Sequence, residues 1–323
     1  MNGGLVIIKP PGMTSHDVVA FVRRLTGVRR VGHSGTLDPA AAGVLNVLIG
    51  PAVRLVEYLQ EGRKVYRCRL VLGATTDTQD ATGQVIERRP VVTGRSDLEA
   101  ILGDFVGPIE QVPPMYSSLK AGGLPLHKLA RRGLEVERRP RPVVIWDLRV
   151  LDYRASVSAG EGDLAEATLE VVCSKGTYVR TLCTDVGRRL GCGGHMGFLI
   201  RLESGGFTLE NGATLEELAA ARETERLADC LRPAADLLRD WPELRVGAEE
   251  AAAITSGRWR TVTGCLIKAD SSETAGRPWV KVTQGGDLVA VGRREPTVAA
   301  VGPTLVHLEK AFPRGNEARG NQG

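Results

Sequence analysis

The spacing of apolar and polar residues predicts three elements at the start of the chain. Residues 4–10 form a short apolar run that a double proline ends, which is typical of a buried strand. Apolar residues then recur at helical spacing over residues 14–25, where Thr14 or Ser15 can cap the exposed amides of a helix. A second apolar run at residues 44–49 indicates another buried strand.

Two later segments alternate apolar and polar residues, which is typical of half-buried strands. Residues 65–72 place Tyr66 on the inward face and arginines on the other face. Residues 165–173 alternate in the same way and lead into a helix that Thr177 can cap and Gly191 can close. The turn between this strand and the helix is a common position for site residues.

The remaining patterns divide the chain into two domains and a tail. A first domain over residues 1–240 contains an insertion at about residues 111–142. The proline and arginine content of this insertion indicates a mobile, basic surface element. Short β-like runs separated by glycine-rich turns predict a small all-β domain over residues 245–311. Residues 312–323 are polar and contain glycine, so we expect a disordered tail. The fold class is therefore α+β.

Composition restricts the compartment and the partners. The chain of 323 residues is long enough for two hydrophobic cores. It lacks a membrane-spanning apolar stretch and a secretory signal, so we expect a cytoplasmic protein. The six cysteines form no Cys-x-x-Cys pair, which predicts reduced packing residues. The formal charge of +4 is concentrated at residues 23–30 and 128–141, each of which is either a solvated helix face or a surface for a polyanion.

The segment GHSGTLDPAAAGVL, residues 32–45, contains the main candidate for chemistry. It is close to the serine-hydrolase pattern Gly-x-Ser-x-Gly, but Thr36 occupies the last position, which makes Ser34 a poor candidate nucleophile. Asp38 lies in the same glycine-rich loop, between a leucine and a proline and ahead of small residues. From the loop alone, Asp38 is either a turn-former or helix cap, or a functional carboxylate.

The other candidate motifs do not predict a metal site. Residues 76–83 (TDTQDATG) lack the spacing and the later glutamate of a calcium loop and are better explained as a capped turn. The five histidines lack the His-x-x-x-His spacing of a zinc site. Arg180, however, stands at a helix start, where the helix dipole disfavours a cation. A nearby anion should compensate it.

Six blocks of the chain, in order, resemble the TruB-type tRNA pseudouridine synthases. Besides the loop at residues 32–45 they are IIKPPGMTSHDVV, VYRCRLVLGATTDTQDATG, PPMYSSLK, KGTYVRTLCTDVG and the carboxy-terminal β region, which looks like a PUA RNA-binding domain. The resemblance covers nearly the whole chain. It implies the pseudouridine synthase fold, a mixed, largely antiparallel sheet with flanking helices and a thumb-like insertion, plus a small all-β PUA domain.

The resemblance also implies a reaction, the conversion of uridine to pseudouridine at position 55 in the T-loop of tRNA. The N1–C1′ bond breaks, the uracil rotates and C5 is joined to C1′, so neither a cofactor nor a metal is expected. The family's essential aspartate maps onto Asp38, its paired arginine onto Arg180, and the tyrosine that stacks on the uracil and helps to remove the C5 proton onto Tyr66. A carboxylate can attack C6, attack C1′ or remove a sugar proton, and all three routes require the ionised form that Arg180 favours.

Other matched positions concern RNA binding. Tyr178 and Leu199 match pocket walls of the family, and His33 matches a histidine that helps to hold the opened RNA loop. Extrusion of a stacked uridine costs free energy that basic and aromatic surfaces must offset. The resemblance assigns this role to the insertion, where Arg131 and Arg132 would contact phosphates, and to the PUA-like domain, which would hold the acceptor end of the tRNA.

The protein implied by the resemblance is a stand-alone enzyme that binds tRNA, with no membrane, guide RNA or obligate protein partner, and we expect a monomer. An RNA-guided synthase, a tRNA-folding chaperone with incidental catalysis and a serine hydrolase stay open as alternatives. The long insertion and the absence of a lysine-rich tail argue against the guided enzyme. Departures from the family pattern at Ser34, Ile8, Asn46 and His127 concern loop packing and RNA affinity rather than the reaction.

Overall fold

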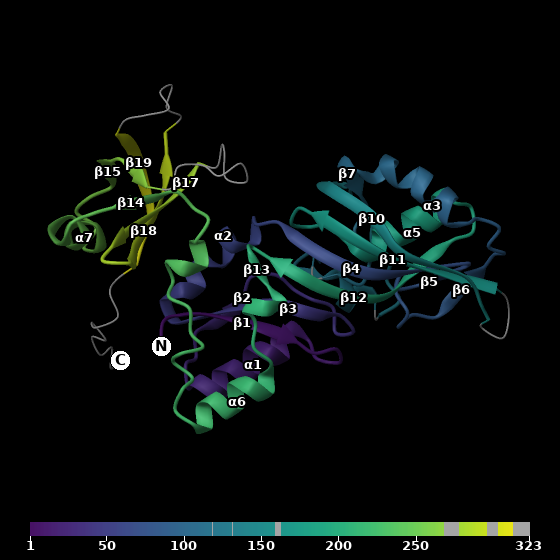
Figure 1. Ribbon diagram of the computed structural model, residues 1–323, viewed down its shortest axis with the longest axis horizontal. Helices are drawn as coiled ribbons and strands as arrows, with labels where there is room; N and C mark the ends of the chain where they lie inside the picture. The colour runs from purple at the N-terminus through teal and green to yellow at the C-terminus, as the bar shows by residue number, and fades with distance from the viewer. Residues whose placement is uncertain (118, 131, 159–162, 268–277, 296–302, 313–323) are drawn as a thin grey trace.

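The computed structural model describes residues 1–117, 119–130, 132–158, 163–267, 278–295 and 303–312, and it contains two bodies joined side by side (Figure 1). Among these residues, the larger body is built on a nine-stranded sheet and the smaller one on a six-stranded sheet. The strands of the large sheet are β1 (Gly3–Lys9), β2 (Val31–His33), β3 (Ala42–Ile49), β4 (Lys64–Leu72), β7 (Gly107–Gln111), β10 (Arg141–Ser158), β11 (Asp163–Cys173), β12 (Gly194–Ser204) and β13 (Phe207–Thr208). The helices of this body are α1 (Ser15–Thr26), α2 (Val56–Gln60), α3 (Arg95–Leu102), α4 (Leu126–Ala130), α5 (Val179–Arg189) and α6 (Leu215–Glu223).

The large sheet consists of two halves that meet at a short parallel contact. Its main path runs β1-β3-β12-β4-β11-β10-β7, while β2 pairs with β3 and β13 pairs with β12. Every neighbouring pair is antiparallel except β3 and β12, which are parallel over the two residue pairs Ile200–Ala42 and Arg201–Gly43. The mixed, largely antiparallel sheet with flanking helices is the one that the resemblance implied.

In the first half of the sheet, β1 and β3 are covered on both faces. Apolar residues of α1 and α6 pack on one face, and residues around α2 and 234–241 pack on the other. Strands buried on both faces read as continuous apolar runs rather than alternating ones. This burial explains the unbroken apolar runs at the start of the chain.

In the second half, one face of the sheet packs against α3 and α5 and the other faces solvent. The inward residues of β4 and β11 join one core cluster with those two helices. On the outer face arginines pair with glutamates across the strands, as Arg67 does with Glu170 at 2.9 Å. This arrangement confirms the alternation predicted for residues 65–72.

The two predicted helix caps had different outcomes. Thr14 caps α1 by accepting a hydrogen bond from the amide of Asp17 at 3.0 Å, as predicted. Thr177 does not cap α5, because the chain enters that helix one residue later, at Tyr178, and the Thr177 hydroxyl donates to the carbonyl of Ser174. The predicted Thr177 cap was therefore wrong.

The carboxy-terminal body is a separate β domain. Its strands follow the order β15-β19-β18-β17-β14-β16. The elements are β14 (Glu243–Arg245), α7 (Ala248–Thr255), β15 (Thr261–Gly264), β16 (Leu266–Ile267), β17 (Trp279–Gln284), β18 (Asp287–Arg294) and β19 (Thr304–Ala311). Within the described ranges, no helix of either body is long and apolar enough to cross a membrane.

An aromatic cluster joins the two bodies. The ring of Tyr58 on α2 meets Trp279 edge-on, with ring centroids 5.0 Å apart, and Trp241 at 5.6 Å. Phe312 is buried in the same cluster. We predicted a disordered tail from Phe312 onward, and this was wrong for Phe312 because its ring packs in the cluster. The rest of the predicted tail, residues 313–323, lies outside the described residues.

Two small hairpins complete the fold. β5 (Ala74–Thr76) pairs with β6 (Val85–Arg88), and the loop between them contains the TDTQDATG segment. β8 (Lys120–Ala121) pairs with β9 (Leu124–Pro125) just before α4, inside the insertion at residues 111–142. The described part of the insertion therefore contains little regular structure, and it is exposed except for the buried residues Gln111, Pro113, Pro114, Ser117, Leu126 and a number of half-buried ones.

Candidate active site

Asp38 lies in the loop between β2 and β3, and the backbone of this loop is fixed on both sides of the carboxylate. The Ser15 hydroxyl, at the start of α1, accepts from the amide of Leu37 at 2.9 Å and donates to its carbonyl at 3.2 Å. The buried ammonium of Lys9 donates to the carbonyl of Pro39 at 3.2 Å and to that of Met13 at 2.6 Å. Burial lowers the pKa of Lys9 to about 8, although Asp38 opposes this shift.

A third buried group, Arg201 on β12, holds the two ends of the same loop. Its guanidinium donates to the carbonyl of Val44 at 2.7 Å and to that of Gly35 at 3.1 Å. Its longest contact is to the carbonyl of Thr36, at 3.5 Å. The loop therefore has little freedom to move relative to the sheet.

Arg180, in the first turn of α5, pairs with Asp38 through two nitrogens. Nε lies 3.0 Å from Oδ2, and Nη2 donates to Oδ1 at 3.2 Å. The same guanidinium donates to the carbonyls of Tyr116, at 2.8 Å, and Thr78, at 3.2 Å. Two-point contact with a planar guanidinium fixes the direction of a carboxylate as well as its charge. Asp38 is thus the anion that we expected near Arg180, because Arg180 is a cation at a helix start.

A second carboxylate, Asp80, lies on the other side of Arg180. Its Oδ2 is 3.5 Å from Nη1 of Arg180, and its Oδ1 accepts from Thr78 and Thr82. We predicted only a capped turn in this segment, and the hydrogen bonds to Oδ1 do form such a turn. The contact with Arg180 was missed because it depends on the bridge between Asp80 and Met196 of β12, which is remote in sequence.

Opposing effects act on the pKa of Asp38. Burial raises its pKa, and the negative charge of Asp80 raises it further, whereas Arg180 lowers it. The net direction is upward, so the arginine only partly offsets the loss of hydration. The side chain stays 34% exposed, so solvent moderates these effects. We expected the guanidinium to favour the ionised form, and the structure adds two opposing effects, burial and the second carboxylate.

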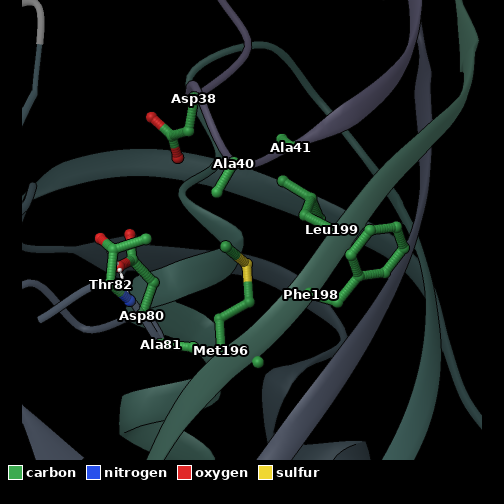
Figure 2. A pocket seen from close by; sticks show the side chains of 10 residues that line it. Asp38, Ala40, Ala41, Asp80, Ala81, Thr82, Met196, Phe198 and Leu199 are labelled. Carbon is green, nitrogen blue, oxygen red and sulfur yellow. Dashed lines mark hydrogen bonds between the residues drawn. The ribbon is translucent and has the colours of Figure 1, made fainter. Parts of the chain in front are cut away.

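An open cavity adjoins Asp38, and its empty space, together with the part that is open to solvent, is about 270 Å³ (Figure 2). Asp38 projects from one wall, Asp80 and Thr82 form another, and Met196, Phe198 and Leu199 of β12 form a third. The other lining residues are Ala40, Ala41, Ala81 and Gly197. The cavity thus combines a few polar groups with an apolar wall, as ligand sites do.

Tyr66 is buried on the inward face of β4 and is the cross-strand neighbour of Arg201. Burial raises its pKa, Arg201 lowers it and Asp38 raises it, so the phenol and the carboxylate lie in each other's field. Tyr178 precedes α5 and is half-buried, and burial likewise raises its pKa. The Gln111 amide at the end of β7 holds the Tyr178 backbone by accepting from its N–H at 2.9 Å and donating to its carbonyl at 3.2 Å.

Leu199 is among the residues that line the cavity, whereas Tyr66, Tyr178, His33 and Arg132 are not. His33 ends β2, where its Nδ1 accepts from the amide of Gly35 at 3.3 Å, and burial, then Arg201, lowers its pKa. Arg132 is exposed just after α4. Arg131 lies outside the described residues.

Two other kinds of site, a hydrolase nucleophile and a metal centre, were raised by the sequence. Ser34 is buried, and its hydroxyl makes no hydrogen bond to a described residue, so the serine–base contact of a hydrolase is not seen there. Among the residues that the structure describes, no group of three His, Cys, Asp or Glu side chains is arranged to hold a metal ion.

Comparisons with known proteins identify relatives of this chain. Residues 23–179 match the model of the TruB family pseudouridylate synthase N-terminal domain, and residues 180–239 match the tRNA pseudouridylate synthase B C-terminal domain. A tRNA pseudouridine synthase B of Symbiobacterium thermophilum is 50% identical over 80% of this chain and 82% of its own length. One of Heliobacterium modesticaldum is 43% identical over 91% of this chain and 90% of its own. Among solved structures, a chain of a Cbf5-Nop10-Gar1 complex aligns with a TM-score of 0.71 at 26% identity, over 96% of this chain and 85% of that one.

Proposed function

Because the chain belongs to the TruB family of pseudouridylate synthases and is an isomerase that converts uridine to pseudouridine in tRNA, we propose that Asp38 is its catalytic carboxylate. The observation that carries this proposal is the two-point pairing of Arg180 with Asp38, which lines the cavity. The pair directs one partly exposed carboxylate toward a space lined by small and apolar residues together with Asp80 and Thr82. Such a space suits a planar base that has left its stack.

The reaction rearranges bonds without an external reactant. The N1–C1′ bond of the nucleotide breaks, a C5–C1′ bond forms, C5 gives up its proton and N1 gains one. Asp38 in its ionised form would attack C6 or C1′ or remove a sugar proton. Tyr66, held on the sheet beside the Asp38 loop, would stack on the uracil and assist the loss of the C5 proton. Leu199 and Tyr178 would bound the pocket.

The target that we propose is the uridine at position 55, in the T-loop. The flipped nucleotide must be held while its neighbours lose their stacking, so further contacts with RNA are required. His33, near the Asp38 loop, would hold the opened RNA loop. Arg131 and Arg132 on the insertion would contact phosphates, and the carboxy-terminal β domain, as a PUA-like domain, would bind the acceptor end. The exposed basic residues at 23–30 add to the surface available for phosphates.

We propose a stand-alone enzyme rather than a guided one. The Cbf5 chain with which this protein aligns was solved together with two other proteins, but the curated relatives of this chain at 43% and 50% identity are named tRNA pseudouridine synthase B. A role in tRNA folding is compatible with catalysis, and a variant that has lost catalysis would keep this role.

The test is to incubate the purified protein with an unmodified tRNA transcript, without guide RNA or cofactor, and to map new pseudouridine. We expect pseudouridine at the T-loop uridine and none in a transcript that carries cytidine at this position. A requirement for a guide RNA or a partner protein would contradict the stand-alone assignment. Modification at other uridines alone would contradict the proposed target.

A further inference from the structure

Arg201 is a buried cation whose hydrogen bonds go mainly to the site's backbone. It is 1% exposed and donates to the carbonyls of Gly35, Thr36 and Val44. Within the part of the chain that the structure describes, it forms no ion pair with a carboxylate. A buried charge without an opposite charge is costly, and carbonyl oxygens compensate it only partly. An apolar residue would fill this place on β12 at lower cost if packing were the sole requirement.

The sheet register shows how the side chain reaches the loop. Gly43 of β3, Arg201 of β12 and Tyr66 of β4 lie in one row across three neighbouring strands. A Cβ at position 43 would overlap backbone atoms of Arg201, and the φ angle of 109° there is one that favours glycine. The glycine therefore lets β12 approach β3 closely, and the guanidinium can reach two carbonyls of the Asp38 loop and that of Val44 on β3.

On its other side, Arg201 is paired with Tyr66. Side chains directly opposite each other in an antiparallel pair are near neighbours. The charge of Arg201 and a hydrogen bond from it lower the pKa of the Tyr66 phenol, against the larger effect of burial. One side chain thus binds the loop that presents Asp38 and is the cross-strand neighbour of the tyrosine proposed to stack on the uracil.

We propose that Arg201 is a positioning residue for the isomerisation, which holds the Asp38 loop and the Tyr66 ring in one fixed frame. The proposal rests on the proposed function, because it assigns no contact with the substrate to Arg201 itself. Its consequence is specific: loss of Arg201 leaves the tRNA-binding surface intact but displaces two reacting groups relative to each other. Displacements of about 1 Å at a reacting centre cost about 100-fold in rate.

The test compares R201M, R201K and a matched control, K64M. Lys64 is also a buried cation that donates to two carbonyls, those of Gln60 and Gly62, but it does not contact the Asp38 loop. We expect R201M to lower the single-turnover rate at saturating tRNA about 100-fold, while the Kd for tRNA stays unchanged. R201K should recover part of that rate, since an ammonium can bind carbonyls but cannot span three of them. K64M should lower the melting temperature and keep the wild-type rate.

Several outcomes would overturn the proposal. A wild-type single-turnover rate in R201M would do so, and so would a loss in K64M as large as that in R201M, because the effect would then be one of general stability. If R201M does not fold, R201K decides: a wild-type rate in that variant rejects the requirement for a planar three-point contact. In each case the wild-type enzyme still forms pseudouridine. Failure of the wild type to form it would instead reject the proposed function.

A double-substitution cycle with Y66F gives a second readout that a merely structural role would not move. If Arg201 acts partly through the Tyr66 ring and its hydroxyl, the rate losses of R201M and Y66F should not multiply in the double variant. K64M combined with Y66F should multiply fully. Full multiplication of R201M with Y66F would remove Tyr66 from the proposed frame.

Discussion

The loop that carries Asp38 and the insertion at residues 111–142 contact the rest of the protein in opposite ways. The loop is fixed by Lys9, Ser15 and Arg201, all of them buried. The insertion contains a pair of two-residue strands and a five-residue helix, and its basic residues are mostly exposed. Groups that react must be held within a fraction of an ångström, whereas groups that grip a flexible polyanion need only be near it.

The two regions are nevertheless joined at one place. Gln111, the first residue of the insertion, holds the backbone of Tyr178 just before α5. Five residues later the carbonyl of Tyr116 accepts from Arg180. The start of the insertion is therefore tied to the residues that hold Arg180 and the start of α5. Substitutions in the two regions should consequently separate catalysis from binding, with the division near Tyr116.

The largest effect that should separate the regions is that of R180M. This variant removes the two-point pairing with Asp38 and leaves the carboxylate without its direction. We expect the single-turnover rate to fall about 10²–10³-fold, as for removal of other preorganised charge contacts, with an unchanged Kd for tRNA. A Kd that rises as much as the rate falls would mean that Arg180 serves binding, and the proposed division would not hold.

The next effect concerns pH. Burial and Asp80 raise the pKa of Asp38, against Arg180 and Lys9. Because the ionised form is required, the rate should fall by about tenfold per pH unit below this raised pKa. The acid limb should lie above the usual aspartate range, and R180M should move it higher, since the guanidinium lowers the pKa. Substitutions in the insertion should leave the limb in place; a shift with R132A would contradict the separation.

A smaller effect is expected from the insertion. Replacing Arg131 and Arg132 by alanine should weaken tRNA binding and lower the slope of log K against log salt by about one for each phosphate that the protein no longer binds. The rate at saturating tRNA should stay at the wild-type value. Replacement of Arg154, an exposed arginine of β10 outside the insertion, is the matched control. An unchanged slope after both substitutions would remove the insertion from the RNA interface.

The smallest effect is on stability. The pKa of Asp38 is higher in the folded than in the unfolded protein, so folding favours the protonated side chain. The protonated side chain therefore adds to the free energy of unfolding in full below the unfolded pKa, and this stabilisation is lost as pH rises through the folded pKa. At neutral pH, D38N should therefore unfold at a slightly higher temperature than the wild type, and the difference should vanish in acid. R132A should show no such dependence. A destabilised D38N at neutral pH would contradict the assigned balance of burial and charge.

The sequence predicts local features well and long-range contacts poorly. Residues 4–10 identify β1 because a strand that is buried on both faces is a continuous apolar run. Residues 65–72 identify β4 because a strand that is buried on one face alternates apolar and polar residues. Asp38 and Arg180 could be paired beforehand because the resemblance implied the pair, and a cation at a helix start requires a nearby anion. Arg201 reads as an ordinary strand residue, and only the register with Gly43 and Tyr66 reveals its contacts.

The errors have the same origin. Thr177 has the right residue type for a cap, but α5 starts one residue later and the Gln111 amide, remote in sequence, holds that end. Phe312 stands in a polar segment and is buried only because α2 and residues 234–241 provide a cluster for its ring. Asp80 meets Arg180 across a bridge to β12. In each case the deciding partner comes from a distant part of the chain.

The most direct measurement of the central claim is single-turnover pseudouridine formation by D38N on an unmodified tRNA transcript, with the Kd for tRNA measured in parallel. The substitution keeps the shape of the side chain and removes its charge. We expect no pseudouridine above background together with a wild-type Kd. Turnover by D38N near the wild-type rate would show that the reaction does not depend on the Asp38 carboxylate.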